Sequence, residues 1–216
     1  MIPFGTPAEI AAAVPTAVTH LARRGVIAYP TETIYGFGST TDALAVDRVA
    51  QLKGRAPGKP FLLLVASPEM VRSVGLRLPD SAVRLAAAFW PGPLTLVLPG
   101  GERELPDVLR GPEGGVAVRW TSHPGASQLV ATLGSPITST SANRPGRSPA
   151  VDGADVEAEF AAEVGSGRLV VFDAGTLVPS QPSTLVDCTG PAPRLVREGA
   201  IGAAVIRSVL PSLVIP

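Results

Sequence analysis

The sequence predicts a single α/β domain built around a twisted mixed β-sheet with flanking helices. Apolar strand-like segments and amphipathic helix-like segments alternate along the 216 residues. No internal repeat and no linker-like break divides them. Hydrophobic residues make up 45% of the chain, which is enough to build one sizeable core. We therefore expect one domain over residues 1–216.

The first element along the chain is a predicted helix over residues 6–25. Thr6 suits the N-cap position, because Pro follows it at the first helical position and Glu comes three residues later. A terminal Gly is expected to end the helix, and Pro15 is expected to split or kink it. The apolar residues 26–30 then predict a short buried strand.

A second helix is expected over residues 41–54, with Asp42 as its N-cap and Gly54 as its stop. Residues 29–38 before it are expected to end the first strand in a glycine-spaced turn. Further helices are predicted at residues 67–75, 79–90, 123–134 and 155–165. Further strands are predicted at residues 60–66, 93–100, 114–120, 136–142, 168–175, 183–188 and 193–201, with a last helix after them.

The charge balance excludes several classes of function. The 18 basic and 18 acidic residues cancel, so the chain is not built to coat nucleic acid or an anionic membrane.

Cys188 is the single cysteine, which excludes an internal disulfide and a cysteine zinc site and favours a small buried side chain. His20 and His123 are too far apart to suggest a metal cluster. No stretch reaches the ~18 apolar residues of a spanning helix, and no signal peptide is visible, so we expect a cytoplasmic protein.

The clearest functional signal is a cluster of lysines. Lys53 and Lys59 are the two lysines of a chain that otherwise uses arginine, and Arg55 lies between them. Like charges gathered in one loop predict a bound anion, and a compact ammonium suits a phosphate. The segment is not a P-loop, because its spacing is one residue short and Pro60 stands where a Ser or Thr would be.

Other polar groups follow the ends of predicted strands. Thr33 lies after the first strand, beside a Glu and a second Thr, where open α/β sheets bind ligands. Arg119 closes a strand of small apolar residues, so it needs either a protein carboxylate or a substrate carboxylate as partner. Ser139 and Ser141 alternate on one strand and should face the same side. Residues 144–153 look flexible and are a candidate lid.

Seven segments together resemble the Sua5/YrdC/YciO/YwlC family: "YPTETIYGFG", "LKGRAPGKPF", "WPGPLTLVLP", "VAVRW" with a following "HP", "STSAN", "PSTLVD" and "VREGAI". They occur in the family's order and cover about residues 10–205. The resemblance implies a YrdC-like fold in the short bacterial form, without an extra C-terminal domain. It also implies threonylcarbamoyl-AMP synthase activity, in which ATP, L-threonine and bicarbonate or CO₂ give threonylcarbamoyl-AMP and pyrophosphate.

The resemblance also implies roles for particular residues. Lys53 and Arg55 are expected to act in catalysis at the nucleotide phosphates. The implied ATP-binding residues are Lys53, Arg55, Lys59, Ser141, Asn143, Ser148 and Arg197, with Mg²⁺ carried by ATP and no dedicated metal site. The implied threonine-binding residues are Thr33, Arg119, Ser139 and Ser183. The chain departs from the family pattern at Ala56, where Pro is common, and at Leu64, where some members have a polar residue.

The resemblance places the reaction upstream of the t⁶A modification at tRNA position 37, so a tRNA threonylcarbamoyl-transfer complex is the expected recipient of the product. Two alternatives stay open. One is a paralogue of the same fold with other carbamoyl-adenylate chemistry, and the other is a double-stranded RNA-binding module. The zero net charge and the 5% aromatic content argue against a broad RNA surface, although weak RNA binding is not excluded by them.

Overall fold

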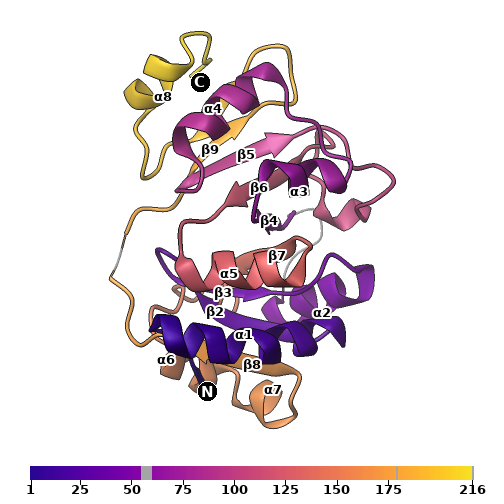
Figure 1. Ribbon diagram of the computed structural model, residues 1–216, viewed down its shortest axis with the longest axis vertical. Coiled ribbons are helices and arrows are strands. Elements are labelled where there is room, and N and C mark those ends of the chain that lie inside the picture. The colour runs from indigo at the N-terminus through magenta and orange to yellow at the C-terminus, as the bar shows by residue number, and fades with distance from the viewer. Residues whose placement is uncertain (55–59, 179, 216) are drawn as a thin grey trace.

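The structure is a computed structural model that describes residues 1–54, 60–178 and 180–215 (Figure 1). Within these residues ten strands form one sheet in the order β1-β8-β2-β3-β7-β4-β6-β5-β9-β10. Four pairs are parallel (β1 with β8, β2 with β8, β4 with β6, β5 with β9), and the other five are antiparallel. This arrangement confirms the predicted α/β fold around a mixed sheet.

The strands are β1 Ile2–Pro3, β2 Val26–Pro30, β3 Tyr35–Gly38, β4 Leu62–Val65, β5 Leu94–Leu98, β6 Val116–Trp120, β7 Ile137–Ser141, β8 Leu169–Asp173, β9 Thr184–Asp187 and β10 Arg194–Arg197. The helices are α1 Pro7–Ala22, α2 Ala43–Lys53, α3 Pro68–Ser73, α4 Asp80–Phe89, α5 Pro124–Leu133, α6 Gly153–Glu159, α7 Ala161–Gly165 and α8 Ala203–Val209, with a 3₁₀ turn at Asp107–Leu109. None of the helices in the described ranges is long and apolar enough to cross a membrane.

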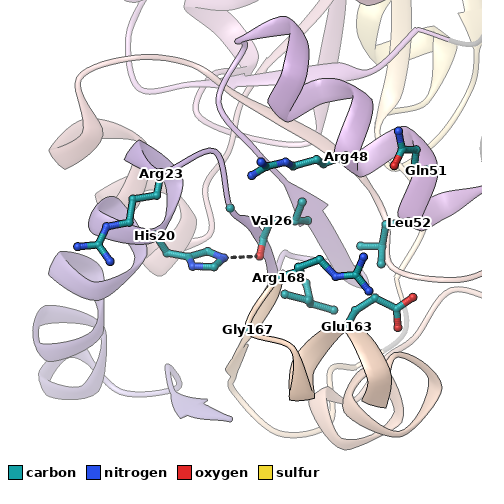
Figure 2. A pocket seen from close by; sticks show the side chains of 11 residues that line it. His20, Arg23, Val26, Arg48, Gln51, Leu52, Glu163, Gly167 and Arg168 are labelled. Atoms are coloured by element: carbon teal, nitrogen blue, oxygen red, sulfur yellow. Dashed lines mark hydrogen bonds between the residues drawn. The ribbon is translucent and has the colours of Figure 1, made fainter.

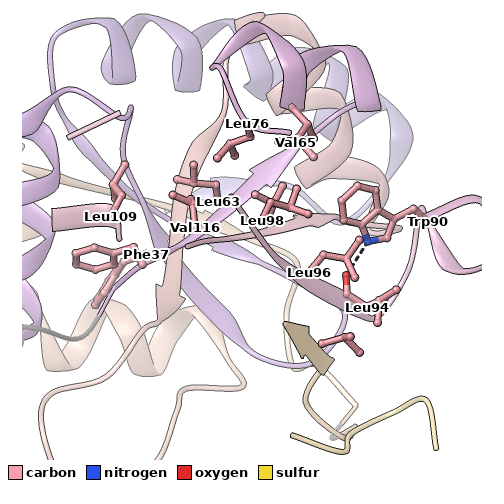
Figure 3. Close-up of a cluster of buried hydrophobic side chains, with 14 of the residues drawn as sticks. Phe37, Leu63, Val65, Leu76, Trp90, Leu94, Leu96, Leu98, Leu109 and Val116 are labelled. Carbon is pink, nitrogen blue, oxygen red and sulfur yellow. Dashed lines mark hydrogen bonds between the residues drawn. The ribbon is translucent and has the colours of Figure 1, made fainter. Parts of the chain in front are cut away.

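Two apolar clusters hold the sheet and its helices together. The larger cluster contains Phe37, Leu63, Leu96 and Trp90, and Trp90 Nε1 donates a hydrogen bond to the Leu94 carbonyl at 2.7 Å (Figure 3). The smaller cluster joins α1 and α5 to β2, β7 and β8, and these two helices lie side by side in Figure 1. Burial of these side chains supplies the main driving force for the fold.

Helix α1 forms as its cap predicts, but it is not interrupted. Thr6 Oγ1 accepts from the Glu9 N–H, and the Glu9 carboxylate accepts from the Thr6 N–H, which completes the capping box. Of the two effects expected of Pro15, the split is wrong, because one helix continues through it to Ala22. The missing N–H of Pro15 lies on an exposed part of the helix, where water can satisfy the carbonyl left without a donor.

Helix α2 matters most for the site, because its last residue is Lys53. Asp42 caps its start by accepting from the Leu44 and Ala45 N–H groups. Gly54 ends it in the left-handed conformation, with φ of +57°. Both ends agree with the sequence, and together they place Lys53 at the end of the helix.

The expected turn over residues 29–38 is wrong in its second half, which forms strand β3. The strand pairs with β2 on one side and β7 on the other. Gly38 allows this close approach, because a Cβ there would lie 2.8 Å from Tyr29 Cε1 and 3.0 Å from the Thr138 carbonyl oxygen. Glycines weaken strand propensity, which is why the sequence alone favours a turn.

The single helix expected over residues 155–165 is also wrong, since α6 and α7 are separate helices. The break falls at Phe160, whose φ of −118° and ψ of 32° are not helical. Its buried ring packs edge-on against Phe37, with ring centroids 4.9 Å apart. Anchoring this ring in the core therefore takes precedence over helix continuity.

Candidate functional site

Lys53 is buried at the end of α2, where its ammonium reaches the end of β7. Lys53 Nζ lies 2.8 Å from the Ser141 carbonyl oxygen and 2.9 Å from Ser141 Oγ. It also lies 3.2 Å from the Asn143 carbonyl oxygen and donates to Asn143 Oδ1. Three residues assigned to one nucleotide site, and separated by up to 90 positions, thus meet at one point.

Asn143 is held so that its amide oxygen faces the lysine. Its Nδ2 donates to the Arg147 carbonyl at 2.6 Å and to the Arg144 carbonyl at 3.1 Å. With both amide hydrogens used in this way, Oδ1 is left as the acceptor for Lys53. Ser141 and Asn143 thus contribute neutral oxygens, which orient the ammonium of Lys53.

Of the other predicted nucleotide-binding residues near Lys53, the structure describes only Ser148. Arg55 and Lys59 lie outside the described residues. Ser148 is exposed on the segment after Asn143 and makes no hydrogen bond within the described ranges. That segment is tied down at its end, since the Ala150 N–H donates to the Ala142 carbonyl at 3.1 Å.

Arg119 and Glu32 form the second polar centre. Arg119 is the fourth residue of β6, and Glu32 follows β2. Arg119 Nη2 lies 2.6 Å from Glu32 Oε2, a close ion pair that lacks the alignment of a hydrogen bond. Arg119 Nε donates to the Gly92 carbonyl at 3.1 Å. Of the two partners considered for Arg119 in the sequence, the structure shows the protein carboxylate.

Glu32 is fixed by three donors on its other oxygen. Its Oε1 accepts from Thr121 Oγ1 at 2.7 Å, from the Ser122 N–H at 2.8 Å and from Ser122 Oγ at 3.0 Å. Burial raises the pKa of Glu32, but Arg119 and these donors outweigh that effect, so its pKa lies below the ordinary value of 4.5. Glu32 is therefore an ionised, rigidly held carboxylate.

The ion pair limits how Arg119 can bind a substrate. Its Nε and Nη2 already face Gly92 and Glu32, whereas Nη1 makes no hydrogen bond within the described ranges. A substrate carboxylate can approach Nη1 alone, or it can bind two nitrogens if Glu32 moves. Binding of a substrate carboxylate by two nitrogens of Arg119 therefore requires Glu32 to move.

A group of hydroxyls lies between these two centres. Tyr29 donates from its hydroxyl to Ser139 Oγ at 2.9 Å, and Thr31 Oγ1 lies 3.5 Å from Thr33 Oγ1. Gly36 brings the two pairs together, since a Cβ on it would lie 3.5 Å from Ser139 Oγ and 3.7 Å from Thr31 Cγ2. The predicted threonine-pocket residues Thr33 and Ser139 therefore share one region.

Ser183 and Arg197 contact one another directly, although the resemblance assigns them to different substrates. Arg197 Nη2 donates to the Ser183 carbonyl at 2.8 Å, and Ser183 Oγ lies 2.8 Å from Thr95 Oγ1. The loop before Ser183 reaches the ion pair, because Ser180 Oγ donates to the Glu32 carbonyl at 3.2 Å. The loop before Ser183 is thus in contact with the segment that carries Glu32.

Leu64 lies beside Arg119 in the sheet. The two residues are register partners on β4 and β6, and Leu64 is buried in the smaller core cluster. This departure from the family pattern is thus next to the predicted carboxylate-binding residue.

Sequence reasoning did not assign a role to Tyr29, Gly92, Thr121 or Ser122. Hydroxyls and carbonyls of this kind carry no distinctive sequence signal, and pairing across the fold is what reveals them. His20 and His123 have structural contacts, as expected, with the Val26 carbonyl and the Ala126 N–H. Within the described part of the chain, no group of three His, Cys, Asp or Glu side chains is arranged to hold a metal ion.

Comparison with known proteins identifies the family. The Sua5/YciO/YrdC family model, described as telomere recombination, matches residues 19–199. The threonylcarbamoyl-AMP synthase of Thiobacillus denitrificans is 41% identical over 170 residues, covering 78% of this chain and 87% of that protein. The threonylcarbamoyl-AMP synthase of Pyrococcus abyssi is 35% identical over 86% of this chain, which spans only 53% of that relative's length.

A solved structure agrees with these matches. The crystal structure of P. abyssi Sua5 complexed with L-threonine aligns with a TM-score of 0.89 and 31% identity. The alignment covers 100% of this chain and 62% of the other. By sequence and by fold, this chain belongs to the Sua5/YciO/YrdC family.

Proposed function

We propose that this protein is an L-threonylcarbamoyladenylate synthase, an enzyme of the nucleotidyltransferase class. Its substrates are ATP, L-threonine and bicarbonate or CO₂, and its products are threonylcarbamoyl-AMP and pyrophosphate. The observation that carries the proposal is the Lys53 ammonium held by Ser141 and Asn143. The threonylcarbamoyl-AMP synthases among its relatives support the same activity.

The first step joins threonine to CO₂. The uncharged amine of threonine attacks the carbon of CO₂, so that a C–N bond forms and one C=O π bond opens onto oxygen. The nitrogen then releases one proton to water, which leaves a carbamate. We assign the amino acid to Arg119, Thr33, Ser139 and Ser183. Arg119 Nη1 would contact the carboxylate, while Glu32 keeps the surrounding charge balanced.

The second step transfers the adenylyl group. A carbamate oxygen attacks the α-phosphorus of ATP, and the bond between the α-phosphorus and the bridging oxygen breaks as pyrophosphate leaves. No covalent enzyme intermediate is needed, so the protein acts by positioning and by stabilising charge. Lys53 is assigned to the phosphates from its position, and Arg55, Lys59, Ser148 and Arg197 are assigned to the nucleotide through the family resemblance.

Mg²⁺ is proposed to arrive with ATP. The oxygens of Ser141 and Asn143 already bind Lys53, so phosphate oxygens and water would supply the ligands of the ion. When bound, Mg²⁺ reduces the charge of the phosphates. We further propose that the product passes in the cytoplasm to a complex that modifies tRNA position 37.

The deciding experiment measures pyrophosphate release from ATP and bicarbonate, with and without L-threonine. The expected result is release that requires threonine, together with threonylcarbamoyl-AMP detected by mass spectrometry. ATP binding without threonine-dependent release would reject the proposal in favour of a paralogue with other carbamoyl-adenylate chemistry. Salt-sensitive binding of double-stranded RNA, with no pyrophosphate release at all, would favour the RNA-binding module.

A further inference from the structure

A cavity of 560 Å³ lies outside the site described above (Figure 2). It is formed by the end of α1, the starts of β2 and β8, the second half of α2, and α7. None of its lining residues belongs to the proposed ATP or threonine site. Its volume falls within the range of about 300–1,000 Å³ that is typical of small-molecule sites.

Three exposed arginines dominate the charged part of the cavity wall. In Figure 2, Arg48 extends from α2 toward α1, Arg168 extends from the segment before β8 toward Leu52 and Glu163, and His20 lies on α1, with Arg23 at the outer rim. Within the described residues, none of the three arginines forms an ion pair. Their hydrogen bonds are to neutral groups, Arg48 Nη1 to the Arg24 carbonyl at 2.7 Å and Arg168 Nε to Ser166 Oγ at 3.0 Å.

The remaining lining suits a ligand that is not simply an inorganic anion. Val26, Leu52 and Leu169 provide an apolar surface beside the arginines. Glu163 lines the same cavity, and its Oε2 is buried without a hydrogen-bond partner. A buried carboxylate oxygen of this kind is costly unless a donor reaches it. That oxygen is not exposed to the cavity, which therefore combines anion-binding groups with an apolar surface.

Two wall residues connect the cavity to the nucleotide site. Leu52 directly precedes Lys53 on α2. Glu163 Oε1 lies 3.4 Å from Arg144 Nη2, and Arg144 directly follows Asn143. Because Lys53 and Asn143 bind each other, a ligand that moves either wall would act on that contact.

We propose that this cavity is a second ligand site, which binds a small organic phosphate and is coupled to the nucleotide site. The guanidinium groups of Arg48 and Arg168 take the phosphate. The apolar part of the ligand packs on Val26, Leu52 and Leu169. The coupling rests on the proposed function, whereas the binding site itself does not.

AMP is the probe for the binding site, measured by calorimetry. Lys53→Ala is used as the background, since it weakens the nucleotide site and leaves the cavity in place. In this background we expect one class of AMP site to remain. Adding Arg48→Ala and Arg168→Ala should raise its Kd at least ~10-fold, the effect of losing charged hydrogen bonds. Adding Arg72→Ala and Arg207→Ala, two exposed arginines outside the cavity, should leave it unchanged.

Two results would overturn the site: the Lys53→Ala protein binds no AMP, or the two arginine pairs have equal effects. The wild type, titrated in parallel, should show two classes of AMP site. The doubly substituted protein with Lys53 intact should show one, so the result does not depend on the folding of the Lys53 variant. Loss of RNA binding alone, with the AMP titration unaltered, also contradicts the proposal.

The coupling is tested by AMP inhibition of pyrophosphate release. Wild type should show mixed inhibition against ATP, because AMP acts at two sites. The Arg48→Ala and Arg168→Ala protein should show purely competitive inhibition, while the Arg72→Ala and Arg207→Ala control stays mixed. Competitive inhibition in all three rejects the coupling. If no protein releases pyrophosphate, the proposed function fails, and the calorimetric result still decides the binding site.

Discussion

Lys53 and Arg119 are both buried cations near strand ends, but their surroundings differ in charge. The ammonium of Lys53 contacts neutral oxygens of Ser141 and Asn143. The guanidinium of Arg119 lies against the ionised carboxylate of Glu32. Neutral oxygens thus orient the first cation, whereas a carboxylate of the protein balances the second.

This difference matches the two substrates of the proposed reaction. A polyphosphate carries several negative charges and is stabilised by cations placed beside it. An amino acid carries one charge of each sign, so a receptor that contains both signs, such as Arg119 with Glu32, suits it.

Removing Lys53 should have the largest effect. Lys53→Ala is expected to reduce pyrophosphate release at least ~100-fold, the size of a lost charge-stabilising group. Arg72→Ala removes an exposed cation from α3 and serves as the control. Near-normal turnover of the Lys53 variant, with its fold intact by circular dichroism, would contradict the phosphate assignment.

Removing Arg119, whose charge is paired with that of Glu32, should weaken the binding of threonine and leave that of ATP unchanged. Arg119→Ala is expected to raise the KM for threonine roughly 10- to 100-fold, the cost of a lost hydrogen bond to a charged group. The KM for ATP should stay within a few-fold of wild type. Parallel increases for both substrates would show that the two centres are not distinct, and Arg119→Lys tests whether charge alone is enough.

Glu32→Gln removes the negative charge that pairs with Arg119 while keeping the size of the side chain. We expect a loss of about 1–3 kcal/mol in unfolding free energy at pH 7, because Arg119 then lies buried beside a neutral group. The pKa of Glu32 is lowered by folding, so its contribution is present above the ordinary value of 4.5 and is lost as the pH falls through the lowered pKa.

Urea unfolding at several pH values measures this effect. The difference between wild type and the Glu32→Gln protein should shrink as the pH falls below about 4.5, where wild type also begins to lose the charge. A constant difference across this range would mean that the ion pair does not account for the loss.

The smallest effect is expected at Cys188, which belongs to neither centre. The thiol is buried, and burial raises its pKa to about 11, so little thiolate exists at neutral pH. Cys188→Ala should retain turnover within ~2-fold. Ellman's reagent should label the thiol slowly in the native protein and rapidly in urea. Rapid native labelling would contradict its burial.

Local signals in the sequence predicted most helices, because caps and stops act within a few residues. Asp42 and Gly54 mark α2 correctly at both ends. Strand β3 escaped prediction since its conformation comes from pairing with β2 and β7, which overrides the turn preference of its glycines. The break at Phe160 likewise depends on a ring contact with Phe37, 123 positions away in the sequence.

The site likewise combines features that the sequence predicts with features that depend on distant contacts. Lys53, Ser141 and Asn143 were assigned to one place from motifs, and the structure brings them together. The partner of Arg119 stayed open, because its Glu32 is 87 positions distant and no local pattern links them. The cavity between α1, α2 and α7 had no sequence signal, since its arginines come from separate elements.

The order of the strands has a consequence for synthesis on the ribosome. β7 joins β3 to β4, although both of those strands are made at least 70 residues earlier, and β1 pairs with β8 near the other end of the chain. Such distant pairings form late. The Lys53 contact depends on the same β7, so a growing chain gains its proposed nucleotide site in the step that unites the two halves of its sheet.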